Sequence, residues 1–227
     1  MINFIDINKI NHDVNLLLDT VTRALGIEDD KWYREKLKND VRHCSLSVAV
    51  EEEVIYHSID TSNQMASKIR KMYGIVQPKE LANALDISIV NINDEINTNF
   101  LYLALYDPNN RKIVINDAVL SMVQHFLFIH NLNNLTSEDD LLNNALYHEI
   151  FHALEDATPG IYTRSKMIKR KLVGLIEYQR GFDGASEVGA IHFSKLMSNL
   201  RYSPCIFEKY ILFIMNQISL DCMLPKV

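Results

Sequence analysis

One apolar stretch, ALYHEIFHALED at residues 145–156, constrains the fold of this chain more than any other. Apolar side chains surround most of its helical circumference, which is typical of a helix that is buried on several faces. His148, Glu149 and His152 interrupt this apolar surface, and buried polar groups are costly unless they have partners. The stretch therefore predicts a buried helix whose central polar residues bind a common partner or bond to nearby backbone carbonyls.

The ends of this helix are also marked in the sequence. Ser137 is a favourable N-cap, and the acidic residues 138–140 that follow it complement the positive end of a helix dipole. The segment TPG at residues 158–160 contains a proline and a glycine, which commonly follow a helix end. We expect a helix from about Glu138 to the TPG segment.

The histidine spacing indicates a metal site. Residues four apart lie on the same face of a helix, so His148 and His152 can both direct ring nitrogens to one ion at about 2.0 Å, which suits zinc. Glu149 is not needed as a ligand and can act as the general base of a metalloprotease. The alternative is that all three are ordinary buried polar residues with hydrogen-bond partners.

A catalytic zinc site normally has three protein ligands and one open position. Glu155 lies seven residues beyond His148, which is about 10 Å along the helix axis and too far to share one ion. Glu187 begins an amphipathic helical pattern in EVGAIHFSKLM and is the preferred third ligand. It could instead be a first-turn glutamate that only complements the helix dipole. Other nearby residues considered as the ligand or as part of the site lining are Glu177, Asp183 and His192.

The remaining segments predict an α+β fold with helices around a small sheet. Two β-rich runs at residues 100–106 and 112–116 flank the turn formers DPNN and indicate a hairpin. A helix at 79–85 and a strand at 87–92 precede the hairpin. Residues 1–60 read as a mostly helical N-terminal segment and 61–227 as the catalytic domain, although the two could form one continuous domain.

Composition limits the partners and the compartment. The net charge of -6 disfavours a nucleic-acid partner, although residues 81–92 also resemble the start of a helix-turn-helix, which leaves a metal-free DNA-binding regulator as an alternative. The three cysteines, Cys44, Cys205 and Cys222, lack CxxC spacing and indicate a reducing compartment. The start of the chain does not resemble a secretory signal, and the apolar segment at 205–220 is too short to span a bilayer. We expect a cytoplasmic protein with no membrane partner; its oligomeric state is not predicted.

Two further features adjoin the predicted site. A basic run is expected to be a solvated helix face, or alternatively a contact for an acidic substrate segment; its residues are Arg164, Lys166, Lys169, Arg170 and Lys171. Tyrosine hydroxyls can donate hydrogen bonds to the oxyanion of a tetrahedral intermediate. The tyrosines considered for this role are Tyr162, Tyr178 and Tyr202.

Four segments stand in an informative order: PKELANALDISIVNI, a hairpin ending in KIVIND, LLNNALYHEIFHALE and EVGAIHFSKLM. This order resembles the ImmA/IrrE-type metallopeptidases over residues 77–200. The resemblance implies a zincin-like, gluzincin-like domain with zinc on His148, His152 and Glu187 and a catalytic Glu149. It also implies a protein substrate, with helix-turn-helix repressors as the class that the family cleaves. The first sixty residues match no part of that family.

A weaker likeness is to toxin and effector zinc proteases, which also combine HExxH with a downstream glutamate, and which would act on a host protein. In either case we expect an extended peptide substrate to lie antiparallel along an edge strand of the hairpin, at 100–106 or 112–116. A zinc-stabilised binding module without turnover is the non-enzymatic alternative.

Overall fold

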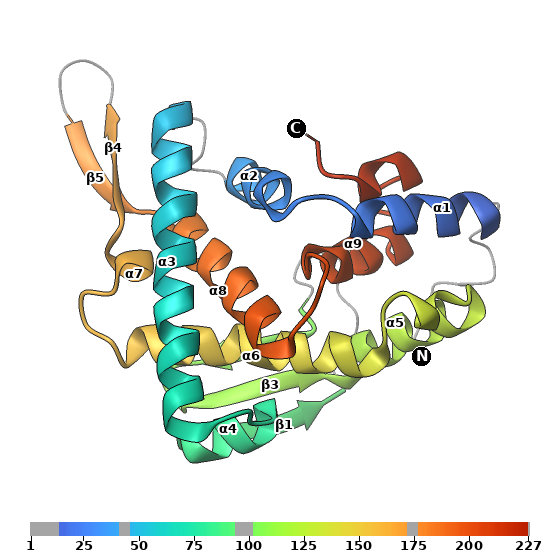
Figure 1. Cartoon of the computed structure of the whole chain (residues 1–227), viewed down its shortest axis with the longest axis horizontal. Helices are drawn as coiled ribbons and strands as arrows, with labels where there is room; N and C mark the ends of the chain where they lie inside the picture. Colours follow the sequence, from blue (N-terminus) through green and yellow to red (C-terminus); the bar gives the residue numbers. More distant parts are fainter. Residues whose placement is uncertain (1–13, 41–45, 94–101, 172–176, 227) are drawn as a thin grey trace.

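The computed structural model describes residues 14–40, 46–93, 102–171 and 177–226. Its α-helices are α1 (Val14–Leu25), α2 (Asp29–Asn39), α3 (Val48–Tyr73), α4 (Pro78–Ala84), α5 (Asp117–Ile129), α6 (Glu138–Asp156), α7 (Tyr162–Ser165), α8 (Asp183–Ser198) and α9 (Cys205–Ile214). Its strands are β1 (Ser88–Ile92), β2 (Ala104–Asp107), β3 (Lys112–Asn116), β4 (Met167–Lys171) and β5 (Glu177–Gly181), and the short 3-10 helices are η3 (Leu132–Asn134) and η4 (Leu220–Met223). The predicted α+β class is confirmed, since the chain is mostly helical with a small mixed sheet (Figure 1).

The small sheet has the strand order β1-β3-β2. β1 is parallel to β3, and β2 is antiparallel to it, so the predicted hairpin is confirmed. Asp107 stabilises the hairpin turn by accepting a hydrogen bond from the Asn109 backbone N–H at 3.0 Å. β2 begins at Ala104; the first two positions of the strand predicted at 100–106 lie outside the described residues. Because β3 is paired on both sides, β2 provides a sheet edge and β3 does not.

Helix α6 has the bounds expected from its capping residues. The Ser137 hydroxyl accepts a hydrogen bond from the Asp140 backbone N–H at 3.0 Å, and the Asp140 carboxylate accepts one from the Ser137 N–H at 3.3 Å. This reciprocal capping fixes the start of the helix. The helix ends at Asp156, and the turn that follows contains Gly160 with a φ of 77°, a conformation that glycine adopts readily.

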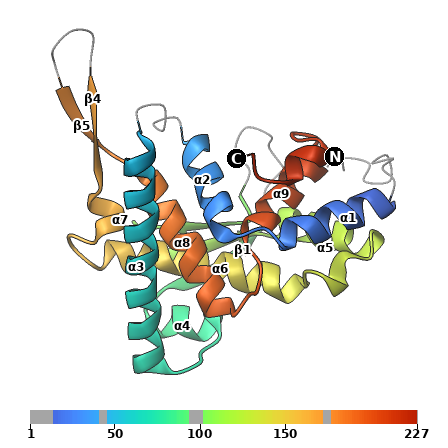
Figure 2. The same ribbon diagram turned by 45° about the horizontal axis from the view of Figure 1, so that its top comes forward.

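Helix α6 lies between the sheet and a second pair of helices. β2 and β3 lie against one face of α6, while α8 packs on its other face and the long helix α3 packs in turn on α8 (Figures 1 and 2). A Cβ added at Gly189 of α8 would meet Phe151 of α6 at 2.8 Å, so glycine permits this close approach. The Ser62 hydroxyl of α3 donates to the Gly189 carbonyl at 2.7 Å and joins α3 to the same helix.

Two hydrophobic cores meet at the α6–α8 pair. One lies between the sheet and α6 and includes Ile113, Ile150 and Phe193. The other joins α1 and α2 to α5 and α9, with Trp32 and Tyr210 among its fully buried side chains. The sequence-based boundary at residue 60 falls inside α3, and the helices before it share their core with α5 and α9.

Three sequence-based interpretations need correction. Residues 88–92 form a strand beside β3, so the second helix of a helix-turn-helix is not formed at 81–92. Much of the basic run belongs to β4, which pairs with β5, and is not a helix face. The helix with Glu187 begins at Asp183, so Glu187 lies in its second turn instead of its first.

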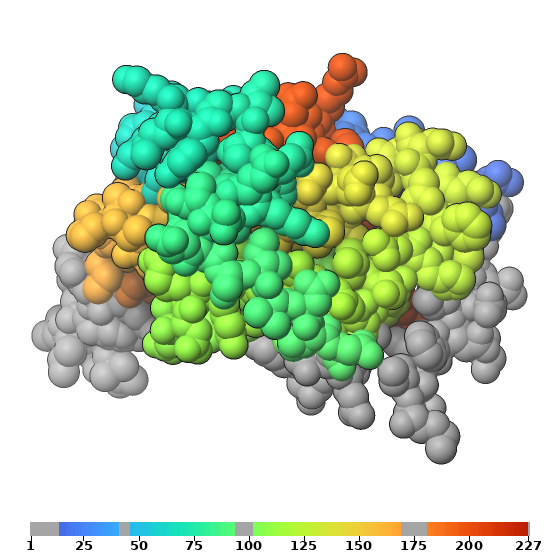
Figure 3. Space-filling view, turned by 90° about the horizontal axis from the view of Figure 1, so that it is seen from below, coloured from blue at the N-terminus to red at the C-terminus, as the bar shows by residue number. Residues whose placement is uncertain are grey.

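The lower side of the molecule is formed by α4 and the neighbouring strands, beside α5 (Figure 3). β1 is largely exposed there, as is expected of a strand at the edge of a sheet. Within the described ranges, every helix is too short or too polar to cross a membrane.

Candidate metal centre

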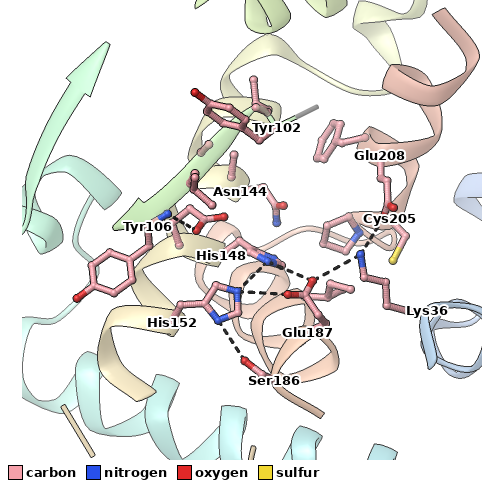
Figure 4. A pocket seen from close by; sticks show the side chains of 18 of the residues that line it. Lys36, Tyr102, Tyr106, Asn144, His148, His152, Ser186, Glu187, Cys205 and Glu208 are labelled. Atoms are coloured by element: carbon pink, nitrogen blue, oxygen red, sulfur yellow. Dashed lines mark hydrogen bonds and ion pairs between the residues drawn. The ribbon is translucent and has the colours of Figure 1, made fainter. Parts of the chain in front are cut away.

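The predicted metal ligands come together at the contact between α6 and α8 (Figure 4). The Nε2 atoms of His148 and His152 are 3.2 Å apart. The Glu187 carboxylate faces both rings, with Oε2 at 3.8 Å from His148 Nε2 and Oε1 at 3.6 Å from His152 Nε2. These ligand atoms all lie within 4.8 Å of one another and are close enough to hold a metal ion.

The orientation of His152 fits a metal ligand. Its Nδ1 lies 3.0 Å from Glu155 Oε2, which in turn accepts a hydrogen bond from the Ser186 hydroxyl at 2.6 Å. Arg164 Nε is also 3.2 Å from that oxygen. A carboxylate that accepts the Nδ1 proton leaves the Nε2 lone pair directed at the centre, as in many carboxylate–histidine–metal arrangements. Glu155 therefore orients the imidazole of a candidate ligand, and its own carboxylate lies outside the group of three ligand atoms.

The charges around the centre also favour a cation. Burial lowers the pKa of His148 to about 3, so its imidazole is neutral at pH 7. Burial alone would lower the pKa of His152, but its hydrogen bond with Glu155 and the nearby carboxylates raise it to about 9. Burial would raise the pKa of Glu187, whereas Lys36 and the two imidazoles lower it overall to about 2. Two facing Nε2 atoms beside a carboxylate need a proton or a metal ion between them, so metal binding would release a proton.

Glu149 links α6 to the sheet. Its Oε2 accepts a hydrogen bond from the Tyr106 backbone N–H at 2.8 Å. The Asn116 backbone N–H donates a hydrogen bond to the Leu103 carbonyl at 2.9 Å, so Leu103 belongs to a hydrogen-bonded pair of the β2–β3 ladder. Hydrogen-bonded and non-hydrogen-bonded pairs alternate along an antiparallel ladder. The backbone N–H and C=O groups of Ala104 and Tyr106 therefore point away from β3. Burial raises the pKa of Glu149 to about 7. A carboxyl group with a pKa near neutrality can both accept and return a proton.

The centre lies on the wall of a cavity of about 660 Å³. β2 forms one side of the cavity, and α6, α8 and α9 form most of the remaining lining. Much of the lining is apolar and includes Leu103, Leu105, Ala145, Phe207, Ile211 and Leu212. The cavity is therefore large enough for part of a polypeptide, and beside the centre it has the outer edge of β2, which pairs with no other strand of the described residues.

Other residues considered from the sequence lie in different places. Asp183 lines the cavity outside the group of three ligand atoms. His192 Nδ1 is 2.8 Å from the Tyr33 hydroxyl, and His192 does not line the cavity. The Tyr162 and Tyr202 hydroxyls bond to Glu53 at 3.5 Å and to Asp140 at 3.2 Å, away from the cavity. The side chains of Glu177 and Tyr178 lie outside the described residues.

Two residues at the cavity were not anticipated from the sequence. Lys36 reaches it from α2, with its Nζ 3.5 Å from Glu187 Oε2 and 3.1 Å from Glu208 Oε2. Asn144 lies one helical turn before His148, and its buried Nδ2 has no hydrogen-bond partner among the described residues. The four-residue spacing of Asn144 and His148 could have predicted that Asn144 lies on the same helix face as His148. No local pattern in the sequence links Lys36 to the centre.

Comparisons of the chain with protein family models, with curated proteins and with solved structures find no match. The function must therefore be argued from the geometry and chemistry of the site.

Proposed function

We propose that this protein is a zinc-dependent endopeptidase with a zincin-like, gluzincin-like catalytic domain. The observation that carries the proposal is the convergence of two imidazole nitrogens and a carboxylate from a second helix beside the buried carboxyl group of Glu149. The edge strand β2 next to the HExxH helix supports the same assignment.

The donor set favours zinc. Two imidazoles and one carboxylate form a ligand set that catalytic zinc sites use, and the 3.2 Å between the imidazole nitrogens is near the edge of about 3.3 Å of a tetrahedron with arms of about 2.0 Å. His148, His152 and Glu187 would hold the ion. When bound, zinc supplies Lewis-acid polarisation of a carbonyl group and acidification of water.

Glu149 is the general base and then the general acid of this reaction. As the oxygen of water bonds to the peptide carbonyl carbon, Glu149 accepts the proton that the water loses. The carbon–nitrogen bond then breaks, and Glu149 returns the proton to the leaving nitrogen. One water is consumed: its oxygen stays on the acyl carbon and both of its protons reach the leaving nitrogen, so a carboxylate and an ammonium group are formed.

The substrate would bind along β2. The outward backbone groups of Ala104 lie on the edge that faces the cavity, where an extended peptide can add as an antiparallel strand. Side chains of this peptide would enter the apolar part of the cavity. The family resemblance makes a helix-turn-helix repressor the first substrate to test, with a host protein as the alternative that an effector protease would cleave.

The test compares wild type with Glu149→Gln. Elemental analysis should find one zinc ion in both proteins, and mass spectrometry of a peptide mixture should find cleavage by wild type only, with a loss in the variant of about 10²–10⁴-fold. Wild type that binds no zinc, or a variant that cleaves as well as wild type, would sink the proposal. Zinc binding without any cleavage by wild type would instead support the non-catalytic module.

A further inference from the structure

Lys36 gives the N-terminal segment a direct contact with the candidate metal centre. It lies on α2, and its ammonium is 3.5 Å from Glu187 Oε2, the same oxygen that is 3.8 Å from His148 Nε2. Lys36 also lines the cavity. Its side chain is 24% exposed, and part of it lines the cavity where a bound molecule would contact it.

The ammonium retains capacity for a further hydrogen bond. Lysine has three N–H donors, and the partners of Lys36 among the described residues are Glu208, at 3.1 Å, and Glu187, at 3.5 Å. Arg164, the other basic side chain of the described cavity lining, is already paired with Glu155 at 3.2 Å and Asp156 at 3.1 Å. Lys36 contacts Glu187 of the centre itself, whereas Arg164 contacts Glu155 outside the group of three ligand atoms, so Lys36 is the better placed cation for an oxygen of a bound substrate.

Lys36 and Glu149, the proposed general base, lie on opposite sides of the two imidazoles. Figure 4 shows Tyr106, whose backbone N–H binds Glu149, on one side of the two imidazoles, and Lys36 on the other side. A peptide carbonyl between them would have the proton acceptor and the cation in different directions. Hydrolysis requires this separation, because water loses its proton to one group while negative charge grows on the carbonyl oxygen.

We propose that Lys36 is a catalytic residue that donates a hydrogen bond to the substrate carbonyl oxygen as that oxygen becomes negative. The inference rests on the proposed peptidase function. The carbonyl π electrons move to the oxygen when water adds, and the Lys36 ammonium keeps its proton while it stabilises the charge. When the carbon–nitrogen bond breaks, the carbonyl re-forms and the hydrogen bond weakens. A residue of the N-terminal segment thus performs the function that the sequence had suggested for a tyrosine.

The experiment compares Lys36→Met with two matched variants of the full-length, zinc-loaded protein. Lys36→Arg keeps a positive charge at the same position. Lys195→Met removes a different ion pair between α2 and α8, the contact of 2.6 Å with Asp29, at a side chain of similar exposure that does not line the cavity. Zinc content, cleavage of a fluorogenic peptide mixture and the affinity for a phosphinic peptide are measured for each protein. The phosphinic group mimics the charged tetrahedral intermediate.

We expect Lys36→Met to retain zinc, to lose about 10²–10³-fold in kcat with little change in KM, and to bind the phosphinic peptide correspondingly more weakly. Lys36→Arg should recover part of both losses, and Lys195→Met should resemble wild type. If Lys36→Met does not fold, Lys36→Gln takes its place.

Three results would overturn the inference. Turnover by Lys36→Met equal to that of Lys195→Met would exclude a catalytic contact while leaving the peptidase function intact. Loss of zinc in parallel with activity would make Lys36 a positioning residue for Glu187. Wild type that neither cleaves peptides nor binds the phosphinic peptide would remove both the inference and the proposed function.

Discussion

The two sides of the candidate metal centre are built in different ways. On one side, α6 presents its functional residues within the stretch 148–152, and the pitch of a single helix sets their geometry. On the other side, Lys36, Glu187 and Glu208 come from α2, α8 and α9, and the first and last of these are 172 residues apart in the chain. Side-chain packing alone brings that second group together.

This difference has consequences for how each side should respond to mutation. A local helical motif persists as long as the helix forms, so changes in it should affect metal binding or chemistry directly. A group assembled from three helices depends on buried contacts some distance from the cavity. Packing mutations should therefore disturb the second side before the first.

The largest effect is expected for the local side. His148→Ala removes one of the three proposed ligands, and if a zinc-binding free energy of about 10–16 kcal/mol is shared among four ligand positions, the loss is about 2.5–4 kcal/mol. Chelator competition should show zinc affinity falling by about 10²–10³-fold. His192→Ala is the control, because this half-buried histidine of α8 bonds to the Tyr33 hydroxyl at 2.8 Å outside the centre. Equal effects of the two changes would argue against the assigned ligands.

The second prediction concerns the packing of α2 against α8, which is independent of the HExxH motif on α6. Leu37 is fully buried and packs against the start of α8, where a Cβ on Gly184 would lie 2.9 Å from its Cδ2. Leu37→Ala should cost about 2–5 kcal/mol of unfolding free energy, measured by urea denaturation. Leu17→Ala, in the same core but on α1, should cost a similar amount. Only Leu37→Ala should also lower the kcat of the folded protein, because it displaces the neighbouring Lys36. If the two variants had equal kcat values, the packing of Leu37 would not affect the position of Lys36.

Much of the fold followed from local signals. Capping at Ser137, the turn formers after Tyr106 and the β-rich run at Lys112–Asn116 predicted α6 and the hairpin correctly. The first half of α3 falls within the segment predicted to be mostly helical, but its start was not located, because the charged stretch EEE hides the buried face of this helix. The strand Met167–Lys171 was also missed, since a basic run gives no sign of the partner strand that pairs with it.

The candidate site divides in the same way. The sequence placed His148, His152 and Glu187 in one group, and the structure brings them together. It gave no sign of Lys36, whose role depends on how α2 packs. Glu155, which its distance along the helix excluded from the predicted ligand set, lies outside the group of three ligand atoms. Its contact with His152 could have been predicted from the three-residue spacing.

A smaller effect is expected for this orienting carboxylate. Glu155→Gln preserves the shape of a side chain that is 2% exposed but removes the charge that accepts the His152 Nδ1 proton. Zinc affinity should fall by about 10–100-fold, the usual cost of losing such a partner. Asp156→Asn changes the neighbouring carboxylate that pairs with Arg164 and should leave zinc affinity nearly unchanged. An unaltered affinity in Glu155→Gln would mean that packing alone orients His152.

The smallest effect tests the strand edge, which belongs to neither side of the metal centre. Ala104→Pro removes a backbone N–H that points away from β3, and proline is tolerated at such positions of edge strands. Losing one hydrogen bond to a peptide substrate costs about 1 kcal/mol, so kcat/KM should fall by about 5-fold while zinc content stays constant. Leu105→Pro is the control, because the Leu105 N–H points toward Val114 of β3 and its loss should lower the melting temperature. If Ala104→Pro cleaved peptides as fast as wild type, the substrate would not bind along β2, and the metal centre would have to act on a peptide held by the helices alone.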